Sequence, residues 1–181
     1  MSTNERRGEV LIAIAREGIA DEDGFAPRVT RSDAWLVEPA ATFVTLRLDG
    51  ALRGCIGSLE ALRPLGEDVY ANARAAAYRD RRFDPVGAHE RDLLQVEVSV
   101  LSAPQPLAAG SESEAIERLR PGVDGVILHY GESRATFLPQ VWENIGDPLE
   151  FLTELRLKAR LPARFWHPAL RLSRYTVEKY K

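Results

Sequence analysis

Apolar side chains recur every three or four residues in several stretches of the chain, which is the pattern of a helix with one buried face. Val10, Leu11 and Ile14 mark the first of these stretches, and Gly18 is expected to end it. Pro64 suits the first turn of a second helix, where the missing backbone N–H of proline is not needed. Helices are therefore predicted over about residues 10–18, 64–78, 111–120 and 147–161.

Strict alternation of apolar and polar side chains predicts strands between these helices. The clearest example is Leu94 to Val100, where one face is apolar and the other carries Gln95, Glu97 and Ser99. Turn residues at 49–50 and 131–133 each separate two such runs and predict hairpins. Strands are expected over residues 43–48, 52–57, 94–100, 126–130, 134–138 and 170–180, whereas residues 21–41 and 79–88 are expected to be irregular.

Hairpins mixed with helices, without strict strand–helix alternation, indicate the α+β class with an antiparallel β-sheet and flanking helices. A chain of 181 residues is long enough for one well-packed domain, with or without a smaller lobe. The net charge of -3 argues against a nucleic-acid partner. The basic stretch 156–174, which contains Phe165 and Trp166, could form an RNA or phosphate surface, but a solvated helix face is the favoured interpretation.

The chain shows neither an apolar core of signal-peptide type near its start nor an apolar run of about 20 residues that could span a bilayer. We therefore expect a cytoplasmic protein with no membrane partner. Cys55 is the single cysteine and cannot form an internal disulfide. No spacing typical of metal ligands occurs, and neither a metal nor a cofactor is expected.

The hairpin that contains Cys55 could close in three registers. A loop of Asp49, Gly50 and Ala51 pairs Arg47 with Arg53 and Thr45 with Cys55, and we prefer it because it gathers the apolar positions on one face. These apolar positions are Val44, Leu46, Leu48, Leu52 and Ile56. A two-residue loop would pair Arg53 with Leu46 and mix charged with apolar side chains. A loop over 48–50 would keep the faces but pair Arg53 with Thr45.

The preferred register places two arginines, Arg47 and Arg53, opposite each other, which is unfavourable unless an acid or a bound anion lies between them. Positive charge beside a thiol favours the thiolate, the nucleophilic form. Gly54 and Gly57 would let another group approach the backbone closely. The competing interpretation is that Cys55 is a small buried apolar residue and that the glycines make room for a helix.

The hexapeptide Leu52–Gly57 (Leu-Arg-Gly-Cys-Ile-Gly) resembles the signature of the AMMECR family, whose bacterial and archaeal members are called AmmeMemoRadiSam system protein A. Residues 43–46, 80–85, 96–102 and 137–142 fit further motifs of that family in the right order. The resemblance implies one AMMECR-type domain over residues 1–181, with an antiparallel sheet and a major and a minor lobe. It also implies a Memo-like protein and a radical SAM protein as partners, but it supplies no reaction.

The resemblance carries a set of site positions over to this chain: Arg53, Gly54, Cys55, Gly57, Asp80, Arg82 and Gln140. The chain departs from the family pattern at two positions. Arg160 stands where members commonly have glycine, so the helix end there could differ. Arg156 stands where many members have a second cysteine, which argues against a mechanism that needs a resolving thiol.

Two functions follow from these residues. The first is a ligand- or partner-binding component that uses the Arg53-Gly54-Cys55 face, with an anionic small molecule as a further expected ligand. The second is a thiol-dependent enzyme with Cys55 as nucleophile, Arg47 and Arg53 holding an anionic group, and Asp80 or a histidine moving protons. The absence of a recognised nucleotide, metal or triad motif favours the first.

Overall fold

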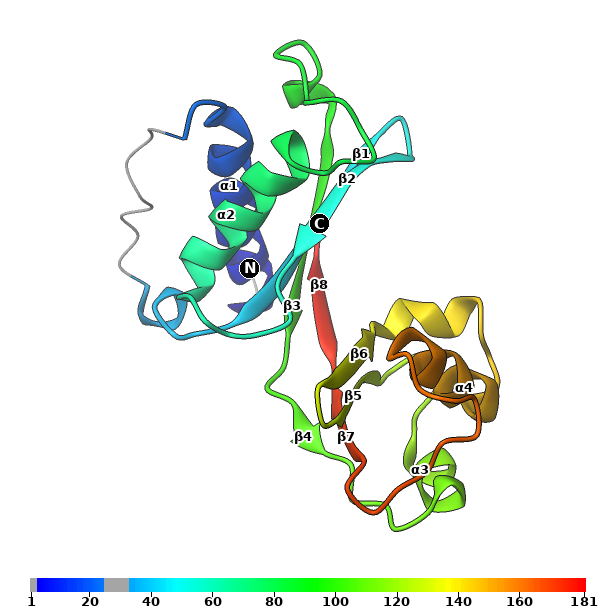
Figure 1. The fold of residues 1–181 in the computed structure, drawn as a ribbon. Helices are drawn as coiled ribbons and strands as arrows, with labels where there is room; N and C mark the ends of the chain where they lie inside the picture. The colour runs from blue at the N-terminus through cyan, green and yellow to red at the C-terminus, as the bar shows by residue number, and fades with distance from the viewer. Residues whose placement is uncertain (1–2, 25–32) are drawn as a thin grey trace. The chain divides into compact units, whose positions relative to one another are not determined.

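The computed structural model describes residues 3–24 and 33–181, and the chain divides into two compact units. The first unit contains the residues up to Leu101 together with Glu178–Lys181, and the second contains Ser102–Val177. Both units combine helices with a four-stranded sheet (Figure 1). The predicted α+β class is confirmed.

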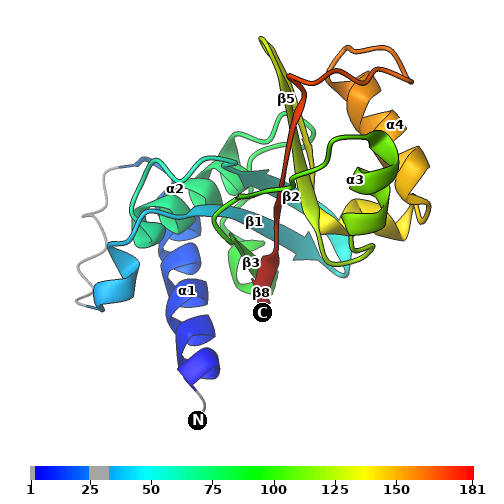
Figure 2. The ribbon, with the colours of Figure 1, turned by 90° about the horizontal axis from the view of Figure 1, so that it is seen from below.

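The first unit contains a sheet with the strand order β2-β1-β3-β8, so that β2 and β8 are its edges. Its elements are α1 (Thr3–Ala20), β1 (Ala41–Leu48), β2 (Ala51–Gly57), α2 (Leu65–Tyr78), β3 (Gln95–Leu101) and β8 (Val177–Tyr180), with short 3₁₀ turns at Ala34–Leu36 and Arg91–Leu93. The two helices pack against each other and against one face of the sheet (Figures 1 and 2). Ile14, Val44, Val69 and Val98 are fully buried between them.

The helix α1 differs from its prediction at both ends. Residues 3–6 are exposed and give no apolar pattern, so the sequence did not reveal the first turns. Gly18 does not end the helix, which continues to Ala20. A Cβ at Gly18 would lie 2.5 Å from the carbonyl oxygen of Tyr70. This glycine therefore allows α1 and α2 to approach closely.

The second unit contains a sheet with the strand order β4-β7-β5-β6. Its elements are β4 (Gln105–Pro106), α3 (Glu112–Arg118), β5 (Gly125–Tyr130), β6 (Ser133–Phe137), a 3₁₀ turn at Pro139–Glu143, α4 (Pro148–Lys158) and β7 (Arg171–Tyr175). Phe151 of α4 is fully buried and stacks on Trp142, with ring centroids 3.8 Å apart. The predicted caps Ser111 and Asp147 accept hydrogen bonds from the backbone N–H groups of Glu114 and Glu150.

The last predicted strand, residues 170–180, is interrupted at Thr176. Its two halves, β7 and β8, belong to different sheets. The backbone of Thr176 pairs instead with Ser102: the Ser102 N–H donates to the Thr176 carbonyl at 2.9 Å, and the Thr176 N–H donates to the Ser102 hydroxyl at 3.0 Å. Apolar alternation alone does not show which sheet a strand joins.

Arg160 ends α4 in the left-handed conformation, with a φ of 61°. The Leu161 N–H donates to the Arg156 carbonyl and the Arg160 N–H to the Leu157 carbonyl, both at 2.9 Å, which is the Schellman arrangement. The helix end therefore keeps the geometry that glycine favours, although an arginine occupies the position.

Replacing Arg160 with glycine should raise the free energy of unfolding by about 0.5–1 kcal/mol, because glycine adopts positive φ without the steric cost of a Cβ. Urea denaturation followed by circular dichroism measures the change. Arg160→Ala removes the same side chain but keeps the Cβ, so it should bring no gain. Equal stabilisation by both substitutions would show that the arginine side chain, and not its backbone conformation, is unfavourable.

Candidate functional site

The hairpin that presents Cys55 closes with a two-residue turn and a bulge, and the predicted three-residue loop is wrong. Asp49 and Gly50 have φ values of 51° and 81°, as a tight hairpin turn with two left-handed residues requires. Leu48 pairs with Ala51 and Arg47 with Leu52, but Leu46 pairs with Gly54, which leaves Arg53 as the extra residue of a bulge. The bulge restores the predicted pairs of Thr45 with Cys55 and Val44 with Ile56.

The predicted contact between Arg47 and Arg53 is therefore absent from the register. Arg47 lies opposite Leu52, is exposed, and donates a hydrogen bond to the Gly50 carbonyl at 3.2 Å. Leu52, which was expected to be buried, is 37% exposed. No anion is needed between the two arginines, since they are not paired.

Arg53 holds the loop that follows α2. Its guanidinium donates to both carboxylate oxygens of Glu90 at 2.8 and 2.9 Å, and to the carbonyl oxygens of Asp84 and Pro85. The hydrogen bond from Arg53 and a second from the Gly87 N–H lower the pKa of Glu90 to about 2. Arg53 is thus paired with an acid of its own chain.

Asp80 and Arg82 cover the free edge of β2 at Cys55. The Cys55 N–H donates to Asp80 at 2.9 Å, and Arg82 donates to the Cys55 carbonyl at 3.3 Å and to Asp80 at 2.6 Å. The hydrogen bonds from the Arg82 side chain and the Cys55 N–H hold the pKa of Asp80 well below its usual range, against the effect of burial. An ionised carboxylate with these donors closes an open strand edge and is poorly suited to proton transfer near neutral pH.

Gly54 and Gly57 lie where other groups of the chain fill the space. A Cβ at Gly54 would lie 2.2 Å from the Ala76 carbonyl oxygen of α2. A Cβ at Gly57 would lie 2.2 Å from the Phe43 ring. The close approach that these glycines were expected to permit is therefore made by the protein itself.

Three polar side chains form a row across the sheet on the face turned away from the helices. We call Cys55, Thr45 and Glu97 the Cys55 row; Thr45 pairs with Cys55 of β2 on one side and with Glu97 of β3 on the other. The half-buried Cys55 thiol lies 3.3 Å from the Thr45 hydroxyl. Lys181 and Lys179 lie 3.2 and 4.0 Å from the Glu97 carboxylate. The alternation of the strands thus places a thiol, a hydroxyl and a carboxylate side by side.

A cavity of about 370 Å³ adjoins the Cys55 row. Thr45 and Glu97 line it together with three cationic side chains, those of Arg16, Arg47 and Lys181. Ile12, Leu94, Gln95 and Val96 complete its wall. The cavity therefore combines an apolar floor with an excess of positive charge, which suits an anionic or amphipathic ligand.

Two residues singled out from the sequence, Gln140 and Arg156, belong to the second unit, whereas the other predicted site residues belong to the first. Gln140 is exposed in the 3₁₀ turn after β6. Arg156 is buried and lies 2.5 Å from Glu112, with hydrogen bonds to the Phe165 carbonyl and the Thr153 hydroxyl. The buried Arg156 therefore forms an ion pair with the half-buried Glu112.

The sequence did not predict a buried polar cluster around Asp68. Asp68 is 1% exposed and accepts hydrogen bonds from the Thr42 N–H and hydroxyl, the Ser58 hydroxyl and Arg63. Asn72, one turn further along α2, donates to the same carboxylate. An acid and an amide four residues apart on the apolar face of a helix were the signal that could have revealed the cluster.

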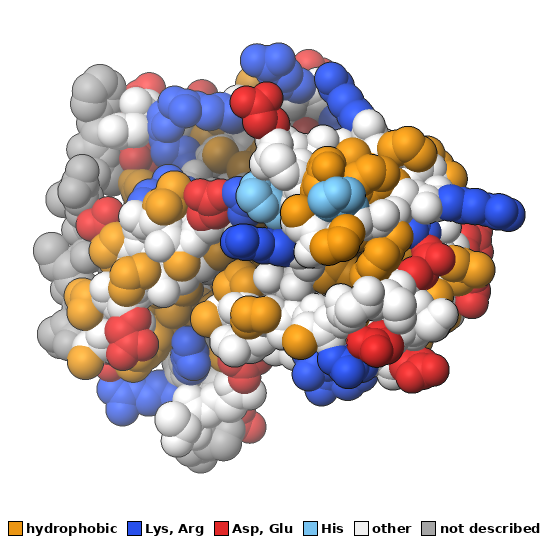
Figure 3. All heavy atoms as spheres, turned by 60° about the horizontal axis from the view of Figure 1, so that its bottom comes forward, with side chains coloured by type: hydrophobic (Ala, Val, Ile, Leu, Met, Phe, Trp, Pro, Cys, Tyr) orange, Lys and Arg blue, Asp and Glu red, His pale blue; other side chains and the backbone are white. Residues whose placement is uncertain are grey.

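Charges on the described surface are mixed in sign. On the face that Figure 3 shows, blue basic and red acidic side chains are interspersed and do not gather into one extended patch. Within residues 3–24 and 33–181, no three histidine, cysteine or acidic side chains lie together as a metal site would require. In the same residues no helix is both long and apolar enough to cross a bilayer.

The fold and the cysteine hairpin together define an α+β protein built around the Leu-Arg-Gly-Cys-Ile-Gly signature. The chain belongs to the AMMECR1 family, whose model matches residues 12–180. A protein of Methanothermobacter thermautotrophicus is 43% identical over 176 residues, which cover 94% of this chain and 92% of the relative. A Thermotoga maritima protein is 40% identical over 144 residues, 78% of each chain.

A solved structure supports the same assignment. The crystal structure of the uncharacterized protein PH0010 from Pyrococcus horikoshii matches with a TM-score of 0.83 and 34% sequence identity. The match covers 97% of this chain and 91% of that one. The fold of the family is therefore the fold of this chain.

Proposed function

We propose that this AMMECR1-family protein is a binding component that recognises a ligand or partner through the Cys55 row, Arg47 and the adjoining cavity. The observation that carries the proposal is the position of Arg47, which lines the cavity beside Thr45 and Glu97. Among the residues that the structure describes, its guanidinium donates only to the backbone carbonyl of Gly50. An exposed guanidinium at the rim of a partly apolar cavity is suited to an anionic group.

The charged residues that the family resemblance marks as site positions support binding more than chemistry. Arg53 and Arg82 are each paired with a carboxylate, and Asp80 is held ionised by its donors. These residues maintain the shape of the hairpin and of the loop after α2. The Cys55 row is left as the polar surface that they position.

The expected partners are a Memo-like protein and a radical SAM protein, which the family resemblance implies. Arg16, Arg47 and Lys181 against Glu97 give the cavity a net positive charge, so we expect an acidic segment of the partner, or an anionic small molecule, to dock there.

The test is a direct binding measurement with purified Memo-like and radical SAM proteins from the same organism. Arg47→Glu should weaken binding about tenfold, since it places like charges in contact. Arg81→Glu is the matched control, because Arg81 is also exposed and does not line the cavity. Failure of both partners to bind, or equal weakening by the two variants, would contradict the proposal.

A thiol-dependent enzyme is the second candidate, favoured by one contact. The Thr45 hydroxyl lies 3.3 Å from the Cys55 sulfur and is the cross-strand neighbour of Glu97, so the row could carry the thiol proton toward a carboxylate. Cys55→Ser separates the two functions, because an enzyme would lose turnover and a binding component would keep its partner. Retained activity in every assay would exclude the enzyme.

A further inference from the structure

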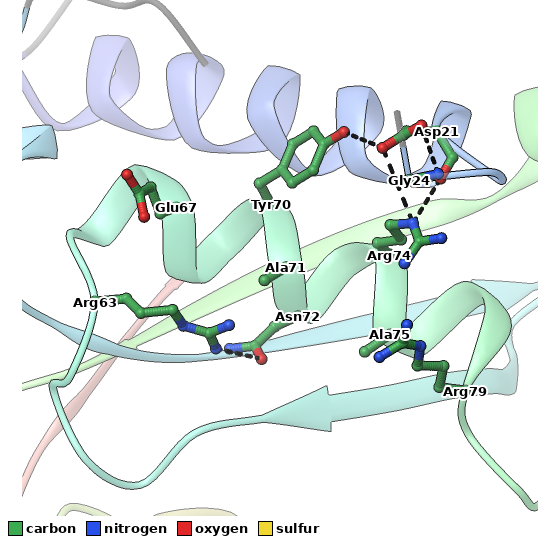
Figure 4. Close-up of a pocket in the computed structure, with 10 residues that line it drawn as sticks. All are labelled: Asp21, Gly24, Arg63, Glu67, Tyr70, Ala71, Asn72, Arg74, Ala75 and Arg79. Atoms are coloured by element: carbon green, nitrogen blue, oxygen red, sulfur yellow. Dashed lines mark hydrogen bonds and ion pairs between the residues drawn. The ribbon is translucent and has the colours of Figure 1, made fainter. Parts of the chain in front are cut away.

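A second cavity, of about 470 Å³, lies along α2 and shares no residue with the cavity beside the Cys55 row. Figure 4 shows the side chains that line it. They are Asp21, Gly24, Arg63, Glu67, Tyr70, Ala71, Asn72, Arg74, Ala75 and Arg79. Three of the ten are arginines and two are acids, and the alanines of α2 leave open space between them.

The charged side chains of this cavity differ in how many hydrogen bonds and ion pairs they form with the rest of the protein. Asp21 accepts a hydrogen bond from the Tyr70 hydroxyl at 2.5 Å and lies 3.9 Å from Arg74. Arg74 also donates to the carbonyl oxygens of Asp21 and Glu22. The guanidinium of Arg79, by contrast, has neither a hydrogen bond nor an ion pair with any residue that the structure describes.

Arg63 is anchored but keeps an open side. It donates to Asp68 at 3.0 Å and to the side-chain oxygen of Asn72 at 3.4 Å, yet its side chain is 42% exposed. The negative charge of Asp68 is shared among four further donors, from Thr42, Ser58 and Asn72. Arg63 therefore retains hydrogen-bonding capacity toward the cavity.

Arg63 and Arg79 stand at opposite ends of α2 and point toward one another on the same side of the helix, with Asn72 and Ala75 between them (Figure 4). Arg79 is the C-cap residue of α2, and its side chain runs back along the helix toward Ala75 (Figure 4). Two guanidinium groups that flank an open space bind best a molecule with an anionic group at each end.

We propose that this cavity binds a small dianion, such as a dicarboxylate or a diphosphate, with Arg79 and Arg63 each holding one anionic group. Asn72 and the small side chains of Ala71 and Ala75 accommodate the part between the charges. Asp21 and Glu67 line the same cavity and oppose anion binding, so a ligand that engages both guanidinium groups is favoured over one that engages a single one. The site is independent of the Cys55 row and of the partner proposed for it.

Calorimetric titration of the full chain at low ionic strength with two probes, pyrophosphate and succinate, tests the proposal. We expect saturable binding of at least one probe, which then identifies the site as one for phosphates or for carboxylates. Arg79→Gln should weaken that binding at least about tenfold, because it removes one of two charge-assisted contacts. The Arg79 guanidinium binds no other group among residues 3–24 and 33–181, so the variant should fold normally.

Two controls keep the result specific to this cavity. Arg81→Gln removes a nearby exposed arginine that does not line it, and Arg47→Glu alters the other cavity; both should leave the affinity unchanged. Absence of saturable binding of either probe, or equal weakening by Arg79→Gln and Arg81→Gln, overturns the proposal. Neither result bears on the binding function of the Cys55 row.

Discussion

Replacing Gly54 with alanine should lower the free energy of unfolding by about 3 kcal/mol or more, because the new Cβ meets backbone and not a movable side chain. It would lie 2.2 Å from the Ala76 carbonyl oxygen and 3.1 Å from the carbonyl carbon. Relief requires α2 to move away from β2, which opens the core around Val44 and Val69. Chemical denaturation followed by tryptophan fluorescence and circular dichroism measures the loss.

Gly146→Ala is the matched control for this prediction. A Cβ at Gly146 meets no atom within 4 Å, and its φ lies outside the left-handed region. The same chemical change there should alter stability by no more than about 0.5 kcal/mol. Equal stability of the two variants would show that α2 does not pack on the signature as described. It would also reopen Gly54 as a place where a ligand approaches the backbone.

Replacing Asp68 with asparagine should lower the free energy of unfolding by about 3 kcal/mol, since it removes the buried charge to which several donors and the half-exposed Arg63 bind. Asparagine has nearly the same shape but turns an NH₂ group toward the donors of Thr42 and Ser58. Arg63 would then lose its carboxylate partner. Thermal and urea unfolding of the variant measure the effect.

The control is Asp92→Asn, a change of the same kind at an exposed position. It should leave stability within about 0.5 kcal/mol of the parent protein. If Asp68→Asn is equally mild, the Asp68 cluster does not hold β1 to α2. The description of Arg63 as anchored by Asp68 at the second cavity would then be wrong as well.

The sequence predicted the position of the cysteine hairpin but not its register. Asp49-Gly50 indicated a two-residue turn, whereas the apolar alternation indicated which side chains share a face. In a regular two-residue hairpin these two indications conflict, because that register mixes charged with apolar side chains on one face. The chain satisfies both with a bulge at Arg53, next to Gly54. A bulge cannot be recognised from the side-chain alternation of one strand, because it is defined by the pairing of two strands. The three-residue loop, which needs no bulge, was therefore predicted and is incorrect.

The contacts of the site positions marked by the family resemblance could not be predicted from the sequence. Arg53 meets Glu90, and Cys55 meets Asp80, over separations of 37 and 25 residues. Such pairs are fixed by tertiary packing of the loop after α2, which carries no periodic signal. Family resemblance marked Arg53, Asp80 and Arg82 as site residues, and the structure places all three around Cys55 as supports of the hairpin.

Glu97 was recognisable as a charge within an otherwise apolar strand, but its neighbours were not. The pairing of β1 with both β2 and β3 brings it beside Thr45 and, one strand further, Cys55. Only this order of strands turns three separate polar positions into one row. The proposed binding surface is therefore a property of the sheet and not of any one motif.

Binding through the Cys55 row requires that this row be an accessible surface, and the alkylation of Cys55 by iodoacetamide tests its accessibility most directly. The thiol is unique in the chain, so mass spectrometry of the intact protein reports this one site. The half-buried thiol should react in the native protein, more slowly than in denaturant, and bound partner should slow the reaction further. Modification that occurs only when the protein unfolds would contradict the claim and make Cys55 a residue of the protein interior.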